Sequence, residues 1–419
     1  MYILLAALII VVIMAVRFSN TVRFLWQHAL SPSPSLGDIP GRASKHPASA
    51  PVLHRMSSDC AARMQAWQIN AYGGPDQLTL NPSAQTPTVK SPDELLVKIH
   101  AASVNPIDAK MLGGYGRNII NILRKRRGLI TSGSEFPLTL GRDFSGTVVE
   151  TGKAVSNFKV GDEVWGAVAA DKSGTHAKYA VLSQNEISKK PDTISHVDAA
   201  SLPYVITTTW AALCTVGELD ERQAPSKRIL ILGGSGGIGT FAIQLAKAWG
   251  MHVTATCGTD AVDLVTGLGA HQVIDYRQKD VWKELSRVEK FDYILDNLGG
   301  KDKDNALPFL KTWQKAKLIT LIHPFLGNLD KLGVVPGLLR TAVSAGVDSL
   351  KGLQSGGSVR WAVFIPNGAA LDKVRRMVDN GKVKPIIHGV FPFSEVPAAF
   401  RCVNEGHLRG KVVIDMESS

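Results

Sequence analysis

The feature that most constrains the fold is a glycine-rich turn between an apolar run and a helix-like segment. The apolar run covers 227–232, and the turn that follows at 233–239 reads Gly-Gly-Ser-Gly-Gly-Ile-Gly. Residues 240–250 have helical spacing and end in glycine, and a second strand-like run at 252–256 closes a strand–helix–strand unit. Such a turn lets the backbone approach a pyrophosphate at a helix N-terminus. The sequence therefore predicts a dinucleotide site here.

The alternation of strand-like and helix-like segments continues after this unit. Further strands are expected at 273–276, 291–297 and 317–322. This order predicts a parallel, doubly wound α/β sheet. The preceding residues, 66–205, instead hold short β-like runs separated by turn residues, which predicts a small β-rich barrel.

The end of the second strand bears on the choice between NADPH and NADH. Proteins that read NAD place an acidic residue there, to bind the ribose 2′-hydroxyl. Residues 256–259 are Thr-Cys-Gly-Thr, and the first acid, Asp260, comes one turn later. A carboxylate would repel a 2′-phosphate, so its absence favours NADPH. No Arg or Lys stands at the strand end, and the candidates for the positive contact are Lys247, Tyr276 and Arg409.

Composition excludes several classes of protein. The 419 residues carry four cysteines without C-x-x-C spacing, so a disulfide framework and a Cys-rich zinc module are excluded. Cys257, in the strand-end turn, is interpreted as a small packing residue. The net charge is +11, yet the basic run at 124–127 has no interleaved aromatic residues. We interpret it as a solvated loop and expect no nucleic-acid partner.

Residues 1–65 are expected to lie outside the fold, as a targeting, anchoring or linker segment. Residues 2–16 are uninterruptedly apolar, and a Pro/Ser-rich stretch runs from 31 to about 50. No basic region precedes the apolar run, as a secretory signal requires, and the run is short for a membrane anchor. Residues 17–63 have the Arg-rich, acid-poor character of a mitochondrial presequence. Translation starting at Met56 or Met64 is a further alternative.

Several stretches together resemble a known family. They are 101–108, 136–143, 200–204, 240–244, 294–297 and 360–362, with the glycine-rich turn, Tyr276 at a strand end and a closing strand at 410–414. Over residues 66–419 the chain resembles the medium-chain dehydrogenase/reductase superfamily, in its zinc-free quinone-oxidoreductase branch. Within that branch it is similar to a mitochondrial group named for interaction with reticulon-4.

The resemblance implies a domain organisation and a set of cofactor contacts. A GroES-like catalytic domain would comprise 66–205 and 365–419, and a Rossmann NADPH-binding domain 206–364, with the cofactor in the cleft between them. The implied contacts are Ser235, Gly237, Ile238, Gly258, Tyr276, Asn297, Leu321, Ala362, Phe364, His407, Leu408 and Arg409. Val262 and Asp263 stand where quinone reductases often carry a lysine. A homodimer and a reticulon or other membrane-protein partner are also implied.

Catalytic zinc is not expected. Zinc alcohol dehydrogenases of this superfamily use a Cys, a Gly-His-Glu and a later Cys, where this chain has Asn105, Gly-Arg-Asp at 141–143 and no cysteine. Arginine cannot ligate zinc and asparagine is a poor ligand. Without a Lewis acid, reduction of an electron-poor acceptor is favoured over oxidation of an alcohol.

The expected reaction is hydride transfer from NADPH to a quinone-like or α,β-unsaturated carbonyl acceptor. Asn105 is a candidate hydrogen-bond partner of the acceptor oxygen, or else a turn residue. Arg142 would stabilise developing negative charge, or else form an interdomain ion pair with Asp143 or Asp108. Tyr204 would donate a proton, or else simply pack near the hinge.

Two functional classes remain open at this stage. The family association with mitochondria implies a role in ubiquinone metabolism. The lack of an obvious acid–base residue leaves a second possibility, an NADPH-binding interaction protein at a mitochondrial or endoplasmic-reticulum membrane with little turnover.

Overall fold

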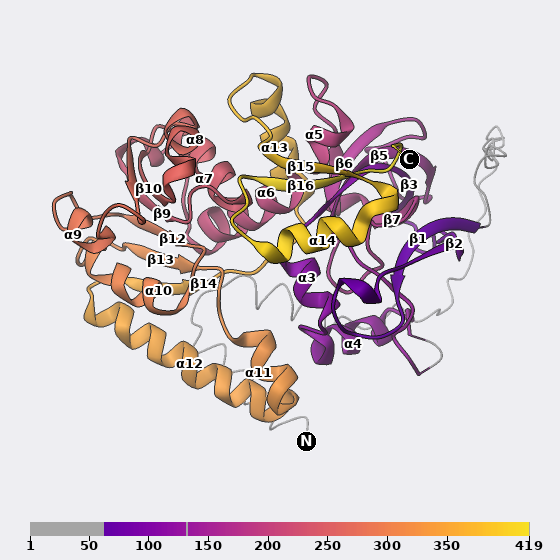
Figure 1. Cartoon of the computed structure of the whole chain (residues 1–419), viewed down its shortest axis with the longest axis horizontal. Helices are drawn as coiled ribbons and strands as arrows, with labels where there is room; N and C mark the ends of the chain where they lie inside the picture. The colour runs from indigo at the N-terminus through magenta and orange to yellow at the C-terminus, as the bar shows by residue number, and fades with distance from the viewer. Residues whose placement is uncertain (1–62, 131–132, 419) are drawn as a thin grey trace, which may run out of the picture.

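The computed structural model describes residues 63–130 and 133–418. The predictions for the leader up to residue 62 therefore lie outside the described residues. Figure 1 shows two sheet-based units side by side, with the long helix α12 (Val334–Gln354) along one border of the second unit.

The first unit is built on two β-sheets. A seven-stranded sheet has the order β15-β16-β3-β5-β6-β8, and β7 pairs with β3. A three-stranded sheet, β2-β1-β4, stands beside it. The strands are β1 (Arg63–Ile69), β2 (Thr79–Gln85), β3 (Glu94–Val104), β4 (Leu138–Thr139), β5 (Asp143–Thr151), β6 (Glu163–Ala167), β7 (Tyr179–Ser183), β8 (Ile187–Lys189), β15 (Ile387–Pro392) and β16 (Lys411–Asp415).

The second unit is a six-stranded sheet of order β11-β10-β9-β12-β13-β14, and every pairing in it is parallel. Its strands are β9 (Arg228–Leu232), β10 (His252–Cys257), β11 (Gln272–Asp275), β12 (Tyr293–Asp296), β13 (Lys317–Thr320) and β14 (Ser358–Trp361). Their apolar runs are buried because helices cover both faces of a parallel sheet. The predicted α/β fold class is confirmed.

Helices join and cover the strands. They are α3 (Pro106–Leu112), α4 (Arg117–Arg126), α5 (His196–Ala200), α6 (Pro203–Trp210), α7 (Gly237–Ala248), α8 (Val262–Gly267), α9 (Val281–Leu285), α10 (Gly300–Ala306), α11 (Phe325–Leu332), α12, α13 (Gly368–Asp379) and α14 (Val396–Glu405). The window 196–216, from α5 onwards, is apolar and long enough to cross a membrane by length and composition, but 78% of it is buried, as in a core helix.

The basic run at 124–127 is not the solvated loop that the sequence suggested. Residues 117–126 form α4, and Arg124 is buried. Arg124 donates to the side chain of Asn121 and, at 3.4 Å, to the carbonyl of Ala170. The apolar stem of an arginine packs well in a helix that is partly covered, so a run of basic letters does not by itself indicate a loop.

The C-terminal strand β16 belongs to the sheet of the first unit. β16 pairs antiparallel with β3, with Val412 opposite Val104. The segment 387–415 therefore belongs to the same sheet as residues 94–189. The domain boundaries predicted near 205 and 365 remain predictions.

Helix α11 of the second unit contacts helix α4 of the first. The carboxylate of Asp330 accepts hydrogen bonds from the backbone N–H of Gly116 at 2.5 Å and of Asn118 at 3.1 Å. Asn118 in turn donates to the carbonyl of Leu329 at 2.8 Å. A carboxylate at a helix N-terminus satisfies N–H groups that have no partner within the helix. This contact joins the two units at α4 and α11.

Candidate functional site

The glycine-rich turn has the geometry that a close phosphate approach requires. Gly233 adopts a left-handed φ of 78°, and the N–H of Gly234 donates to the carbonyl of Thr256 at 2.7 Å. A Cβ on Gly239 would lie only 2.2 Å from the carbonyl oxygen of Gly233. Strand β9 and helix α7 therefore meet with no room for a side chain, and the N-terminus of α7 points out of the sheet edge.

The first unit closes over this helix N-terminus. The N–H of Gly410 donates to the carbonyl of Ser235 at 3.0 Å, and Gly236 and Gly410 form an isolated β-bridge. A Cβ on Gly237 would lie 2.7 Å from Cδ of Lys411. Ile238, in the first turn of α7, is half-buried and packs on the core. The predicted phosphate contacts Ser235, Gly237 and Ile238 thus lie at a seam between the units.

A cluster of charged groups surrounds Gly258 at the end of β10. A Cβ on Gly258 would lie 3.2 Å from Nε of Arg277 and 3.3 Å from the hydroxyl of Tyr276. Asp260 accepts hydrogen bonds from Arg277 at 3.3 Å and from Arg409. The bond from Arg409 holds the pKa of the Asp260 carboxyl below its usual value. Two guanidinium groups and one carboxylate therefore meet beside Gly258 and Tyr276.

This cluster differs from the sequence prediction in two ways. Arg277 was not predicted, because the cation was expected at the end of the second strand, while Arg277 follows the third. The predicted candidate Lys247 lies elsewhere, since its Cδ would be 2.1 Å from a Cβ on Gly269. The second difference concerns Asp260. Its Oδ1 would lie only 3.2 Å from a Cβ on Gly258, so the carboxylate stands at the end of β10, and both arginines pair with it.

The carboxyl ends of β12 and β13 reach the same edge of the sheet. Asn297 donates to the carbonyl of Leu232 at 2.9 Å, while its Oδ1 is buried without a hydrogen-bond partner. Leu321 follows β13 directly and packs against the core of the second unit. An unpaired buried acceptor at this edge suits a ligand that carries a donor, such as an amide.

Ala362 and Phe364 lie just beyond the end of β14, rather than within the strand as the sequence suggested. The carbonyl of Ala362 is 3.2 Å from Nε2 of His323, and the ring of Phe364 stacks on Tyr204 with centroids 4.6 Å apart. Burial raises the pKa of the Tyr204 phenol, which therefore stays protonated. Tyr204 thus lies between the two units, against the strand-end segment of the second.

His407, Leu408 and Arg409 form the loop that precedes β16. His407 has a left-handed φ of 52°, and the guanidinium of Arg409 donates to the carbonyls of His407 and Leu408. The loop is thereby folded around the Arg409 side chain, which directs the guanidinium toward Asp260.

A buried polar network underlies the predicted catalytic residues, and it centres on Lys411. Lys411 Nζ donates to Asn105 Oδ1 at 2.5 Å, Ser103 Oγ at 2.8 Å and Asp143 Oδ2 at 3.1 Å. Asn105 Nδ2 and Ser103 Oγ also donate to Asp143 Oδ2, at 2.8 and 2.5 Å. The backbone N–H of Tyr204 donates to the second oxygen of Asp143. The sequence prediction missed Lys411, although it included Asn105 and Tyr204.

Arg142 lies in this buried region but contacts different groups. Its Nε is 3.6 Å from Asp108 Oδ1, and its NH1 donates to the carbonyl of Ala169 at 2.5 Å. Burial raises the pKa of Asp108 and lowers that of Arg142. All of these partners belong to the first unit, so the pair is not interdomain, as one of the two sequence interpretations had it.

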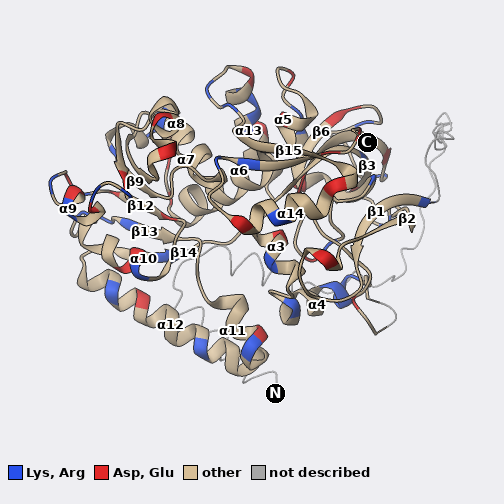
Figure 2. Cartoon of the chain, in the orientation of Figure 1, with Lys and Arg blue, Asp and Glu red and all other residues tan. Residues whose placement is uncertain are grey.

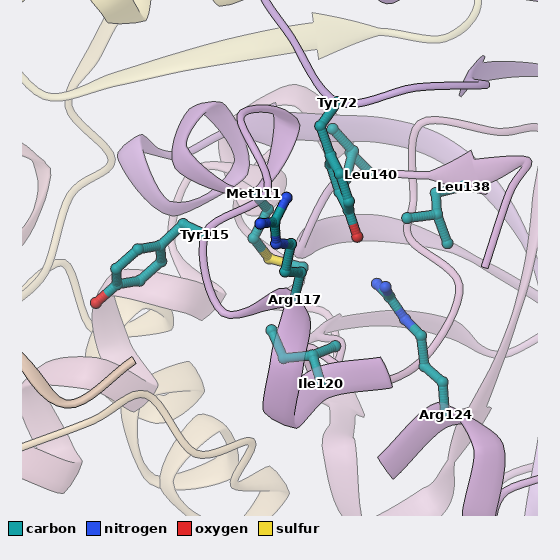
Figure 3. A pocket seen from close by; sticks show the side chains of 8 residues that line it. All are labelled: Tyr72, Met111, Tyr115, Arg117, Ile120, Arg124, Leu138 and Leu140. Atoms are coloured by element: carbon teal, nitrogen blue, oxygen red, sulfur yellow. The ribbon is translucent and has the colours of Figure 1, made fainter. Parts of the chain in front are cut away.

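A small hollow lies in the first unit beside Arg124 and Arg142. Figure 3 shows its lining, in which the side chains of Tyr72 and Arg124 point toward one another. The other lining residues are Met111, Tyr115, Arg117, Ile120, Leu138 and Leu140. Arg124 and Arg142 donate to the neighbouring carbonyls of Ala170 and Ala169, which places the hollow next to the buried network.

Within residues 63–130 and 133–418, no group of three or more His, Cys, Asp or Glu side chains is arranged to hold a metal ion. Burial raises the pKa of the Cys257 thiol to about 11, which keeps it protonated and agrees with a packing role.

Comparison with known families assigns both parts of the chain. Residues 91–192 match the alcohol dehydrogenase GroES-like domain, and residues 268–414 match the family described as zinc-binding dehydrogenase. The mouse protein "NAD(P)H oxidoreductase RTN4IP1, mitochondrial" is 50% identical over 353 residues, covering 84% of this chain and 89% of the mouse protein. The chain belongs to the medium-chain dehydrogenase/reductase superfamily.

Two further relatives agree with this assignment. "Reticulon-4-interacting protein 1, mitochondrial" from Caenorhabditis elegans is 35% identical, covering 87% of this chain and 98% of that protein. The solved structure of the quinone oxidoreductase from Coxiella burnetii superposes with a TM-score of 0.67 at 28% identity, covering 85% of this chain and all of that one. The predicted family and enzyme class are confirmed, and the protein is a quinone-oxidoreductase-like member of this superfamily.

Proposed function

We propose that the protein is a mitochondrial, NADPH-dependent reductase that transfers hydride to a quinone-like or α,β-unsaturated carbonyl acceptor without zinc. The observation that carries the proposal is the seam between the units, where the glycine-rich turn meets Lys411 and its buried network. Arg277 and Arg409 meet beside Gly258, and Phe364 stacks on Tyr204 near the segment after β14. We infer that an extended dinucleotide would run along this seam from the two arginines toward Asn297, Ala362 and Phe364.

The residues present suit NADPH. The first-turn N–H groups of α7 would bind the pyrophosphate, because the first N–H groups of a helix have no helical partner. Arg277 and Arg409, with Tyr276, would bind the 2′-phosphate in place of Asp260, which now occupies both guanidinium groups. The unpaired Asn297 Oδ1 would accept from the carboxamide. When bound, NADPH supplies the hydride.

Asn105 is the candidate for direct contact with the acceptor. Its amide already accepts from Lys411 and donates to Asp143, so its orientation is fixed and one N–H remains to bond an acceptor oxygen. Reduction of a quinone to a hydroquinone takes one hydride and one proton, and the proton comes from solvent or from a neighbouring donor. With its raised pKa, Tyr204 is a weak proton donor that stays neutral.

Arg142 is proposed as a positioning residue rather than a contact. It is fully buried and acts through Asp108, which accepts from the backbone N–H of Asn105 at 2.9 Å. The electrostatic interaction between buried charges remains strong over several ångströms, because the protein interior has a low dielectric constant. Arg142 would therefore orient Asn105 and favour negative charge on the acceptor.

The proposal that zinc plays no part rests on the donor set. The positions of the zinc-binding Cys and His of zinc alcohol dehydrogenases carry Asn105 and Arg142, and the Lys411 ammonium lies 2.5 Å from Asn105 Oδ1. A fixed cation at this distance leaves the site poorly suited to a second one. These residues do not fit a zinc site.

One observation favours the alternative, an NADPH-binding interaction protein with little turnover at a mitochondrial or endoplasmic-reticulum membrane. Asn105, Arg142 and Tyr204 are buried or nearly so and engaged by neighbouring groups. The name of the nematode relative mentions reticulon-4, and for this alternative we propose a reticulon or other membrane protein as the partner. The link to ubiquinone metabolism likewise rests on family resemblance.

A steady-state assay distinguishes the two. The full chain is offered NADPH or NADH with a soluble quinone or an enone, and NADPH binding is titrated in parallel. The reductase proposal predicts turnover with NADPH well above that with NADH. Tight NADPH binding with no turnover on any acceptor would instead support the interaction protein. A reporter fused to residues 1–65 tests location separately, and it is expected at mitochondria.

A further inference from the structure

Helix α12 presents its apolar side chains to solvent and its small or polar ones to the protein. The buried residues are Gly337, Thr341, Ala345, Asp348 and Gly352. The exposed ones are Val335, Leu339, Val343, Val347, Leu350 and Leu353, each between 46% and 61% exposed. An ordinary surface helix has the opposite arrangement.

The exposed residues form one continuous stripe. Their spacing of three or four residues keeps them within an arc of about 120° on the helix, opposite the buried face. From Val335 to Leu353 the stripe is about 27 Å long, at about 1.5 Å per residue. In Figure 1, α12 runs along the outer border of the second unit, away from the first unit except at its α11 end.

The buried face is polar or small for a packing reason. A Cβ on Gly337 would lie 2.7 Å from the carbonyl oxygen of Asn328, and one on Gly352 would lie 2.7 Å from the backbone nitrogen of Val359. Close backbone approach anchors α12 to α11 and β14 through its small residues, and the exposed apolar residues lie on the opposite side of the helix. Their exposure along a patch of this length marks an interaction surface.

Near the stripe, the acidic side chains of α11 and α12 form contacts within the protein, whereas two basic side chains are exposed. The carboxylates of α11 and α12 turn inward, where Asp330 binds the N-terminus of α4 and Asp348 accepts from Lys303 and Trp361. The cations Lys331 and Arg340 are exposed instead. Figure 2 shows blue segments on α11 and α12 at the outer border of the molecule, with red segments beside them. The stripe is thus flanked by positive charge.

An exposed tryptophan stands next to one end of the stripe. The side chain of Trp313 is 73% exposed, and its backbone N–H donates at 2.6 Å to the carbonyl of Gly356, just after α12. Trp313 and Lys315 both adopt left-handed backbone angles, with φ of 59° and 58°. This conformation is energetically unfavourable for residues other than glycine, and such residues are often found at functional sites. Tryptophan beside lysine is typical of the membrane–water interface.

We infer that α12 and Trp313 form a docking surface for an anionic phospholipid membrane. The apolar stripe would enter the headgroup–acyl boundary while Lys331, Arg340 and Lys315 contact lipid phosphates. A second copy of the chain fits less well, because the same cations would then face each other across the contact. The apolar segment 2–16 has no acidic residue to pair with them. The inference is independent of the acceptor proposed above.

Vesicle binding of the full chain tests the surface. The triple variant Leu339→Ser/Val343→Ser/Leu350→Ser should bind mixed phosphatidylcholine–phosphatidylglycerol vesicles at least tenfold more weakly than the wild type. The matched control Val160→Ser/Val390→Ser/Leu80→Ser removes three exposed apolar side chains elsewhere and should bind within twofold of the wild type. Both should bind NADPH as the wild type does, which reports the fold. Vesicles of phosphatidylcholine alone should bind the wild type weakly.

A second measurement separates this surface from residues 1–62, which could hold any variant on the vesicle. Brominated lipids should quench the tryptophan fluorescence of the wild type more than that of Trp313→Phe, because Trp313 would lie at the acyl boundary. Equal quenching in the two would overturn the inference. So would a triple variant that is monomeric where the wild type is a dimer without lipid, since a second copy would then cover the stripe.

Discussion

Lys411 is the residue on which the buried polar network depends. It is the cation that faces Asp143, and its ammonium reaches Ser103 and Asn105 as well. The carboxylate of Asp143 is fully buried, and a buried charge without a partner is costly. The same lysine stem packs on Gly237 at the cofactor turn. One side chain thus links the stability of the first unit to the geometry of the seam.

Replacing Lys411 by methionine is expected to lower the free energy of unfolding by about 3–5 kcal/mol, because it leaves Asp143 charged and unpaired. Denaturant unfolding measures this loss. The control Lys153→Met removes an exposed lysine and should change stability by less than about 0.5 kcal/mol. Adding Asp143→Asn to Lys411→Met should recover part of the loss, and no recovery would argue against the charge explanation.

Arg277 and Arg409 are expected to determine the preference for NADPH. Arg277→Ala should raise the Kd for NADPH about tenfold to a hundredfold, the value of one charge-assisted hydrogen bond, and leave the Kd for NADH nearly unchanged. Cofactor titration by fluorescence measures both. Arg222→Ala, at an exposed site, is the control. An equal weakening of both cofactors would place Arg277 outside the 2′-phosphate site.

Two histidines, the fully buried His176 and the half-buried His323, make stability depend on pH. Burial lowers the pKa of His176 and of His323 from 6.5 to about 4. Between these values the unfolded chain binds more protons than the folded one, so stability falls as the pH drops from 6.5 toward 4. Each histidine contributes at most about 1.4 kcal/mol per pH unit. Unfolding of His176→Gln across this range should show a shallower slope than the wild type, and an unchanged slope would contradict this assignment.

At this scale the sequence predicts some site residues and misses others for a clear reason. The placement of Asn297 and Leu321 at the carboxyl ends of β12 and β13 could be predicted, because each belongs to the end of a recognisable apolar run of a parallel sheet, while their role in binding stays a prediction. Lys411 could not, since its contact with Ser103 depends on the antiparallel pairing of β16 with β3 across most of the chain. Arg277 was missed because β10 and β11 lie next to each other only in the folded sheet.

Among the elements, the turn between β9 and α7 is the most tightly constrained. Its glycines differ in how much room they have. A Cβ on Gly239 would meet the backbone of Gly233, whereas one on Gly236 would find no atom within 4 Å. Because the two glycines lie three residues apart in the same turn, a substitution at Gly236 is a suitable control for one at Gly239.

Gly239→Ala is expected to lower the free energy of unfolding by about 1–3 kcal/mol and to weaken cofactor binding, because strand and helix must separate. Gly236→Ala, with an ordinary extended backbone, should change stability by less than about 0.5 kcal/mol. Thermal unfolding with and without NADPH checks both. Equal stability of the two variants would show that the close contact at Gly239 is not required.

Strands and helices with a regular apolar sequence pattern could be predicted. Short helices whose start depends on capping contacts could not. The strands of the parallel sheet agree with their apolar runs to within a few residues. Helices α3 and α4 were missed because they are short. They begin at Pro106 and at Arg117, directly after the N-cap residues Asn105 and Gly116, and the N-terminus of α4 is capped by Asp330 from a distant helix. The outward apolar stripe of α12 was also missed, since a periodic pattern does not show which face is buried.

For the whole molecule, function depends on how the two units meet. The contacts that cross between them include the Ser235–Gly410 bond, the packing of Gly237 on Lys411, and the bonds from α4 to Asp330. Together they enclose the seam in which the cofactor is proposed to lie. The order of strands and helices predicts two such units. How the units pack against each other depends on individual contacts, such as the Ser235–Gly410 bond, that the sequence pattern does not specify.

The central claim is zinc-independent hydride transfer from NADPH held in this seam, and a single-turnover experiment tests it most directly. The full chain, loaded with NADPH and treated with a zinc chelator, is mixed with a soluble quinone while the absorbance of reduced nicotinamide is followed. We predict complete oxidation at a rate that the chelator does not change and that Asn105→Ala slows. NADPH that stays bound and reduced, or oxidation that stops with the chelator and returns with zinc, would contradict the account.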